Sequence, residues 1–219
     1  MIIYATHKGG RYLPLAESLR LDSTNLRGLY VNLTNRCNCD CVFCLRQKKS
    51  MAAESSLWLE HEPTVAEVKA ELDAAPWQVV KEVVFCGFGE PTIRLAELVE
   101  LLAYVKKMRP QMPTRLNTNG LGELYHGREI AADFENILDT ASISLNAATA
   151  ERYFKLTRAA YGLKSFEAML TFAEHMKACV PYVVLTVVDH VTPPEEIAAC
   201  QKICDERGLT LRVRPYEDS

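Results

Sequence analysis

The chain has 219 residues, of which 48% are hydrophobic and 24% are charged, a composition typical of a folded globular protein. Its 25 basic and 28 acidic residues give a formal net charge of −3, so no basic excess favours nucleic acid or a membrane surface. No apolar run approaches the roughly 20 residues of a transmembrane helix, and the first residues lack the features of a signal peptide. We therefore expect a cytoplasmic protein with no membrane or nucleic-acid partner.

Strand-like and helix-like segments alternate from about residue 30 to the end of the chain. We predict strands near residues 30–34, 82–87, 113–118, 140–146, 182–189 and 209–214. Most of their starts are separated by close to the roughly 30 residues of a βαβ unit. This alternation predicts an α/β fold with a parallel sheet.

The ends of several helices can be predicted between these strands. Thr64 and Glu67 form a capping box. An apolar stripe that starts at Leu95 is stopped by Pro110, and Ser165 is predicted to cap a third helix. The apolar face of the last helix contains Ile197, Cys200, Ile203 and Cys204.

Polar side chains alternate with apolar ones along several predicted strands. The polar positions are Asn32, Thr34, Arg115, Asn117, Asn119, Ser142, Ser144, Asn146, Thr210, Arg212 and Arg214. Because strand side chains alternate between faces, one face would pack on helices and the other would line a polar lumen. Six strands fall short of the eight in a complete barrel. We predict an open, partial (β/α)6 TIM-like barrel, and the alternative is a polar face that is merely solvated.

The predicted domain organisation is simple. We treat residues 1–219 as a single domain, with a short N-terminal extension over residues 1–26 and the partial barrel core over residues 27–216. Ligands are expected at the carboxyl ends of the strands, where α/β folds place them.

Four of the eight cysteines lie on one short loop after the first predicted strand, at positions 37, 39, 41 and 44. Thiolates select zinc, copper(I) or iron–sulfur clusters. Structural zinc usually takes two separated ligand pairs, whereas Cys37, Cys41 and Cys44 would hold three irons of a cubane and leave the fourth open. Cys39 as a fourth ligand of a closed site is the alternative. The remaining cysteines of the predicted helices, Cys179, Cys200 and Cys204, are interpreted as core residues.

The Cys37-x3-Cys41-x2-Cys44 loop, with Phe43 before its last cysteine, resembles the signature of radical S-adenosylmethionine (radical SAM) enzymes. After the second strand, Cys86-Gly87-Phe88-Gly89-Glu90-Pro91 resembles the Gly-Gly-Glu-Pro element of that superfamily, with Phe88 between the glycines. Over about residues 25 to 216 the chain is most similar to the TatD-associated radical SAM proteins.

This resemblance implies a [4Fe-4S] cluster on Cys37, Cys41 and Cys44 whose open iron binds S-adenosylmethionine. Reductive cleavage would give a 5′-deoxyadenosyl radical that abstracts hydrogen from an unidentified substrate. Glu90 would receive the methionine amino group, and Phe43 would lie near the adenine. The expected cofactor-binding residues are Phe43, Gly87, Gly89, Glu90, Pro91, Asn117, Asn119, Ser144 and Asn146.

Cationic side chains near the predicted strand ends suggest an anionic substrate such as a carboxylate or phosphate. The candidates are Arg115, His190, Arg212 and Arg214, and the alternative is that they form ion pairs with Asp189 or Glu217. Residues 46–49 would dock an acidic flavodoxin or ferredoxin as electron donor, unless they are simply a solvated surface. Residues 51–61 form an insertion that would cover the cavity.

Two other functions stay open from the sequence alone. The size and cysteine spacing also resemble activases that place a glycyl radical on a partner protein. A non-catalytic metal or iron–sulfur protein, with Cys37, Cys39, Cys41 and Cys44 as its ligands, is the alternative from another class. Asn35 and Asn38 would either tune the cluster or shape the turn.

Overall fold

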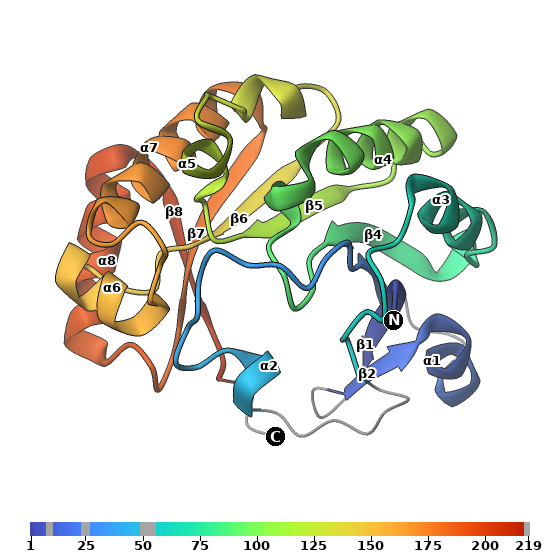
Figure 1. Ribbon diagram of the computed structural model, residues 1–219, viewed down its shortest axis with the longest axis horizontal. Helices are drawn as coiled ribbons and strands as arrows, with labels where there is room; N and C mark the ends of the chain where they lie inside the picture. The colour runs from blue at the N-terminus through green and yellow to red at the C-terminus, as the bar shows by residue number, and fades with distance from the viewer. Residues whose placement is uncertain (8–10, 23–26, 49–55, 217–219) are drawn as a thin grey trace.

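The computed structural model describes residues 1–7, 11–22, 27–48 and 56–216 (Figure 1). Within them, one eight-stranded sheet has the order β2-β1-β3-β4-β5-β6-β7-β8. The strands are β1 (Ile3–His7), β2 (Arg11–Pro14), β3 (Arg27–Val31), β4 (Val80–Phe85), β5 (Thr114–Thr118), β6 (Thr140–Ser144), β7 (Tyr182–Val188) and β8 (Thr210–Arg214). Neighbours from β3 to β8 are parallel, which confirms the six predicted strands.

The edge strands β2 and β8 do not pair with each other, so the sheet stays open as predicted. The prediction did not include the hairpin of β1 and β2, which extends the sheet because β1 pairs antiparallel with β3. The N-terminal extension is therefore part of the same sheet as the six parallel strands.

Helices cover the outer face of the curved sheet, with α4 and α7 packed over its middle strands (Figure 1). The helices are α1 (Leu15–Leu21), α2 (Leu45–Lys48), α3 (Val65–Asp73), α4 (Leu95–Met108), α5 (Gly122–His126), α6 (Ala150–Thr157), α7 (Lys164–Cys179) and α8 (Pro194–Arg207). Short 3-10 helices also occur, namely η2 (Trp77–Val79), η3 (Pro91–Arg94) and η4 (Ala131–Phe134). In the part of the chain that the structure describes, no helix has the length and apolar character that crossing a membrane requires.

The alternation along the strands separates an apolar face from a polar one. Val83, Leu116, Ile143 and Leu185 are fully buried beneath the helices. The intervening side chains Arg115, Asn117, Ser142 and Ser144 are half-buried on the concave face. The polar lumen predicted from the period of two is confirmed.

The predicted helix ends are confirmed with one exception. Thr64 and Glu67 make the capping box of α3, and α4 ends at Met108, two residues before Pro110. Ser165 does not cap α7, because the helix begins one residue earlier and the Ser165 hydroxyl is buried without a partner among the described residues. A turn closed by the bond from Ser165 N–H to Gly162 O starts this helix instead.

The three cysteines predicted to be core residues differ in burial. Cys200 and Cys204 lie on the buried face of α8 and are fully buried, as expected. Cys179, the last residue of α7, is only half-buried and packs against the edge of the core. The sequence therefore predicted a deeper burial of the Cys179 side chain than the structure shows.

Candidate functional site

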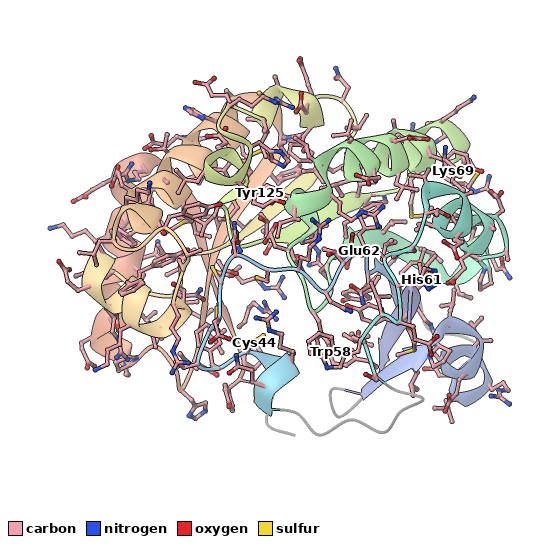
Figure 2. The ribbon with its side chains drawn as sticks, in the orientation of Figure 1. Cys44, Trp58, His61, Glu62, Lys69 and Tyr125 are labelled. Carbon is pink, nitrogen blue, oxygen red and sulfur yellow. The ribbon has the colours of Figure 1, made fainter. Side chains whose placement is uncertain are left out.

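The cysteine loop follows β3 and crosses the concave side of the sheet before α2 begins at Leu45 (Figure 1). Cys37, Cys41 and Cys44 are half-buried, whereas Cys39 is 4% exposed and belongs to the apolar core. Figure 2 shows Cys44 beside α2 on this side of the molecule. Burial thus separates the three cysteines of the C-x3-C-x2-C spacing from the fourth.

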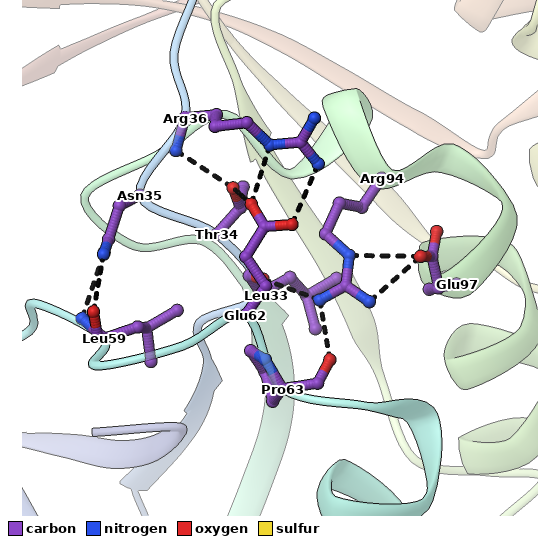
Figure 3. Close-up of polar contacts among 9 residues, drawn as sticks. All are labelled: Leu33, Thr34, Asn35, Arg36, Leu59, Glu62, Pro63, Arg94 and Glu97. Carbon is purple, nitrogen blue, oxygen red and sulfur yellow. Dashed lines mark hydrogen bonds and ion pairs between the residues drawn. The ribbon is translucent and has the colours of Figure 1, made fainter.

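Polar contacts hold the segment between β3 and the first cysteine (Figure 3). The buried Arg94 guanidinium donates to the carbonyl of Leu33 at 2.9 Å and to that of Pro63 at 2.7 Å. Arg36 forms an ion pair with Glu62 at 2.7 Å, and Glu62 also accepts from the Thr34 hydroxyl. The loop is thereby tied to residues 62–63 and to η3.

Asn35 was expected either to tune a cluster or to shape the turn. Its side-chain amide donates to Leu59 O at 2.8 Å and its oxygen accepts from Leu59 N–H at 3.1 Å (Figure 3). Both polar ends of the side chain are therefore engaged in joining two segments of the chain. Asn35 shapes the loop.

The second half of the loop is fixed by the end of α6. Asp40 N–H donates to Thr157 O and Val42 N–H donates to Leu156 O, both at 2.9 Å. Beyond the helix, Ala160 N–H donates to Asn38 O at 2.9 Å. These three main-chain bonds flank Cys39 and Cys41, so α6 determines the path of the cysteine loop.

Asn119 faces the cysteine loop. Its amide nitrogen lies 2.5 Å from Asn38 Oδ1, 3.5 Å from Cys39 Sγ and 3.8 Å from Cys37 Sγ. Its own oxygen accepts from Leu121 N–H at 3.0 Å. Asn119 was predicted to bind the adenosylmethionine. Among the described residues, its side chain contacts the cysteine loop and the N–H of Leu121 in its own turn.

Glu90 is almost fully buried at the end of the loop that follows β4. Its Oε1 accepts from the hydroxyls of Thr92 and Thr118, each at 2.7 Å, and its Oε2 accepts from Asn119 N–H at 2.7 Å. Burial raises the pKa of this carboxyl, while the hydrogen bonds from Thr118, Asn119 and Thr92 oppose that shift. The carboxylate is thus fixed in place and carries no cationic partner within the described residues.

Gly87 and Gly89 allow the β4 loop to approach the segment after β3. A Cβ atom added at Gly87 would lie 2.0 Å from Asn32 Oδ1, and one added at Gly89 would lie 2.3 Å from the carbonyl oxygen of Thr34. Both positions were predicted to bind the cofactor. In the structure their small size is required by neighbouring protein atoms. Pro91 begins η3 and places Glu90 as its N-cap.

A pocket of about 150 Å³ lies between the last cysteine and the ends of β7 and β8. Its lining residues are Phe43, Cys44, Leu45, Val188, Arg214, Pro215 and Tyr216. Aromatic rings from Phe43 and Tyr216 and one guanidinium meet here. The pocket suits a flat ring with a polar edge.

The other predicted lumen residues differ in their contacts. Asn117 Oδ1 is buried without a hydrogen-bond partner among the described residues. Arg115 forms an ion pair with Glu82 at 3.2 Å, while Arg212 is exposed. Asn146 is buried with φ 59°, beyond the end of β6.

His190 was a predicted substrate residue. It is exposed with φ 59°, and its ring contacts that of Tyr216 at a centroid distance of 6.5 Å. Glu217, one of the proposed ion-pair partners, lies outside the described residues. Asp189 accepts instead from the backbone N–H of Tyr216 at 2.5 Å.

The donor set of the cysteine loop consists of thiols, which are the ligands that iron–sulfur clusters take. No three His, Cys, Asp or Glu side chains of the described residues gather as ligands of one ion. A cubane binds each thiolate through a different iron. Three half-buried thiols on a loop braced at both ends would supply three of its four ligands.

The sequence model of the Radical SAM superfamily matches residues 31–202. This match covers the cysteine loop, Glu90 and most of the parallel sheet. The chain therefore belongs to the radical SAM superfamily, whose enzymes use a [4Fe-4S] cluster and S-adenosylmethionine. The narrower resemblance to TatD-associated proteins stays a prediction.

Curated relatives carry the name GTP 3′,8-cyclase. The protein of Corynebacterium glutamicum (strain R) is 32% identical over 222 residues, which cover 95% of this chain and 55% of the relative. That of Mycobacterium ulcerans (strain Agy99) is 31% identical over 211 residues, covering 91% of this chain and 52% of the relative. The chain spans about half the length of the curated relatives it matches.

Solved structures share the fold at low sequence identity. Streptococcus suis SuiB bound to the precursor peptide SuiA superposes with a TM-score of 0.65 at 18% identity, covering 91% of this chain and 42% of SuiB. A radical SAM methyltransferase from Sphaerobacter thermophilus gives 0.63 at 16% identity, covering 87% of this chain and 55% of the methyltransferase. These likenesses agree with the open, mostly parallel sheet.

Proposed function

We propose that this chain cleaves S-adenosylmethionine reductively at a [4Fe-4S] cluster held by Cys37, Cys41 and Cys44. The observation that carries the proposal is a loop with three half-buried thiols, joined through Asn119 to the buried carboxylate of Glu90. When bound, the cluster and adenosylmethionine would supply a 5′-deoxyadenosyl radical that abstracts hydrogen from a substrate. The protein's own residues bind and orient these groups.

Glu90 would receive the methionine ammonium. Among the described residues its Oε2 accepts only from Asn119 N–H, which leaves lone-pair capacity for a cation. Because the carboxylate is buried and no cation of the described residues pairs with it, a ligand ammonium would form a charge-assisted hydrogen bond there. Pro91, Gly87 and Gly89 would fix the loop that presents this carboxylate.

The pocket beside Cys44 would hold the adenine. Phe43 and Tyr216 supply apolar surface, and the main chain around Pro215 borders the pocket. Ser144, Asn146 and Asn117 stand at or beyond the ends of the neighbouring strands, where ribose or carboxylate oxygens would lie. Asn117 Oδ1 is buried without a hydrogen-bond partner among the described residues, so a hydroxyl of the ligand would donate a hydrogen bond to it.

An anionic substrate would depend chiefly on Arg214. The ion pair with Glu82 offsets the charge of Arg115, and Arg212 and His190 are exposed to solvent. Arg214 is half-buried at the end of β8 on the wall of the adenine pocket and forms no ion pair among the described residues. Its guanidinium is therefore the candidate for a carboxylate or phosphate of a substrate bound beside the adenine. Relatives named GTP 3′,8-cyclase make GTP the first substrate to test.

The electron donor would be a flavodoxin or ferredoxin. The predicted docking segment, residues 46–49, lies partly outside the described residues. Arg46 turns toward the loop, where it donates to Cys39 O at 3.1 Å and pairs with Asp40 at 3.7 Å. Arg46 therefore supports the loop more than it offers a free charge to a partner.

The predicted insertion over residues 51–61 would close the N-terminal side of the lumen. Residues 51–55 lie outside the described residues. Leu57 is buried in a cluster with Tyr4, Tyr12 and Phe88, and the half-exposed Trp58 contacts Phe88 with ring centroids 5.3 Å apart. These contacts support a wall that joins residues 1–26 and 27–216 into one domain.

The test is anaerobic reconstitution with iron and sulfide, followed by dithionite, S-adenosylmethionine and quantification of 5′-deoxyadenosine. The wild type is expected to form it and Cys41→Ala to form none. Cys179→Ala, which removes a half-buried thiol from the last residue of α7, is the matched control and should retain activity. A parallel arm adds GTP and measures its consumption. A loaded wild-type cluster that gives no 5′-deoxyadenosine with or without GTP would contradict the proposal.

A further inference from the structure

Tyr153 carries a buried hydroxyl that nothing in the described protein satisfies. The residue lies on α6 with 0% of its surface exposed, and its Oη has no hydrogen-bond partner among the described residues. Its ring packs against Phe166, with the centroids 5.7 Å apart. A phenylalanine would fill this space equally well, because packing alone does not need the hydroxyl. An orphaned buried hydroxyl costs free energy unless a bound group completes its hydrogen bond.

Tyr153 belongs to the apolar core that also contains Cys39 and against which Cys37 and Cys41 pack. Three and four residues after Tyr153, the end of α6 accepts the main-chain bonds of Val42 and Asp40, so the same helix holds the cysteine loop. Burial raises the pKa of Tyr153 well above its usual value, and the neighbouring Cys39, Cys41, Glu90 and Cys37 raise it further. A tyrosine hydroxyl of ordinary pKa is already protonated at neutral pH, so its O–H is available as a donor.

A second donor, from another part of the chain, contacts thiols of the same loop. The Asn119 amide nitrogen lies 3.8 Å from Cys37 Sγ and 3.5 Å from Cys39 Sγ. Asn119 follows β5, whereas Tyr153 belongs to α6. A group bound by the cysteines would thus have two donors near it. The Asn119 amide already has acceptors, whereas the Tyr153 hydroxyl has none among the described residues.

We propose that Tyr153 is a positioning residue whose hydroxyl donates a hydrogen bond to a sulfur of the cluster held by Cys37, Cys41 and Cys44. This inference rests on the proposed function, because the acceptor is the cluster itself. A donor to a cluster sulfur stabilises the reduced form, which carries one more negative charge, relative to the oxidised form. Tyr153 therefore raises the reduction potential of the cluster.

The test compares Tyr153→Phe with the wild type after anaerobic reconstitution to equal iron and sulfide content. The midpoint potential is measured by potentiometric titration with electron paramagnetic resonance detection. We expect a lower potential in the variant, with an equilibrium constant for reduction that falls up to about tenfold, or about 59 mV for one electron. Tyr161→Phe removes the same atom from a half-buried tyrosine after α6 and should leave the potential unchanged.

A second measurement needs no cluster. In the cluster-free protein, Tyr153→Phe removes an unsatisfied buried hydroxyl, so its melting temperature should equal or exceed that of the wild type. A melting temperature several degrees lower would show that the hydroxyl has a protein partner, and the inference would fall. It would also fall if the loaded variant kept the wild-type potential, or if Tyr161→Phe shifted it equally. A wild type that takes up no cluster overturns the proposed function as well, and this is visible before any potential is measured.

Discussion

The main-chain nitrogen of Asn119 lies 2.7 Å from Oε2 of Glu90, and this contact joins the segments that follow β5 and β4. The Thr118 hydroxyl reaches the other carboxylate oxygen at the same distance. Two neighbouring residues of one strand end therefore set the orientation of the carboxylate from the adjacent loop. The same strand end contacts the cysteines through the Asn119 side chain, so Glu90 and the thiols share one support.

Replacement of this carboxylate is expected to weaken cofactor binding. In Glu90→Gln the shape is kept but the charge is lost, and one amide hydrogen opposes the N–H of Asn119. A hydrogen bond between charged groups contributes about 1.5–3 kcal/mol, so affinity for S-adenosylmethionine should fall roughly 10- to 150-fold. Anaerobic equilibrium dialysis of the loaded protein measures this. Glu100→Gln, on the exposed face of α4, is the control, and equal affinities in both variants would contradict the role of Glu90.

Removal of the fourth loop cysteine is expected to leave the cluster intact. Cys39 is buried in the apolar core, unlike the other three thiols, so Cys39→Ala should retain wild-type iron and sulfide content. The substitution leaves a small cavity and should lower stability by about 1–2 kcal/mol. Iron and sulfide analysis beside Cys41→Ala makes the comparison. Loss of iron from Cys39→Ala would show that the site is closed by four thiolates.

The buried guanidinium behind the cysteine loop is expected to support stability. Arg94 donates to two main-chain carbonyls and pairs with Glu97 at 3.0 Å (Figure 3). A lysine cannot reproduce this fork, so Arg94→Lys should lower the free energy of unfolding by about 2–3 kcal/mol. Urea titration measures the change. Arg128→Lys alters an exposed ion pair and should cost about 0–1 kcal/mol. Equal effects would contradict this role.

The capping box of α3 is expected to make stability depend on acidity. Hydrogen bonds from the Thr64 backbone and hydroxyl, and then from His61, lower the pKa of Glu67 to about 2 from its ordinary value of 4.5. Since the folded value is depressed, the stabilisation is complete above about pH 4.5 and is lost as the pH falls toward 2. The urea midpoint of Glu67→Gln should therefore fall less than that of the wild type between pH 5 and pH 3. Glu129→Gln, on an exposed segment, should follow the wild-type curve.

Much of the fold could be predicted because its signals are local. The alternation along residues 114–118 and 140–144 marks both faces of the sheet, and the Thr64 capping box marks the start of α3. The hairpin of β1 and β2 could not be predicted, since its place depends on the free edge of β3. Pairing partners far apart in sequence leave no local pattern.

The sequence predicted which side chains face the lumen as far as the last residue of each strand. Asn119 and Asn146 were assigned to the lumen by extending the period of two beyond Thr118 and Ser144. The strands end at those residues, and the backbone turns, with Asn146 at φ 59°. The alternation of side chains holds only while the chain stays extended. Tyr153 could not be found because no sequence signal relates α6 to the cysteine loop.

The bonds between the cysteine loop and the end of α6 have a consequence for the order of folding. Arg158 pairs with Asp40 across a sequence separation of 118 residues, and Thr157 O accepts from Asp40 N–H. Contacts of such long range form late, because a large loop must close before they contribute. The thiols of the loop therefore reach their final arrangement only after strands β4 to β6 and α6 have assembled. Delivery of iron and sulfide to this protein must follow the folding of most of its length.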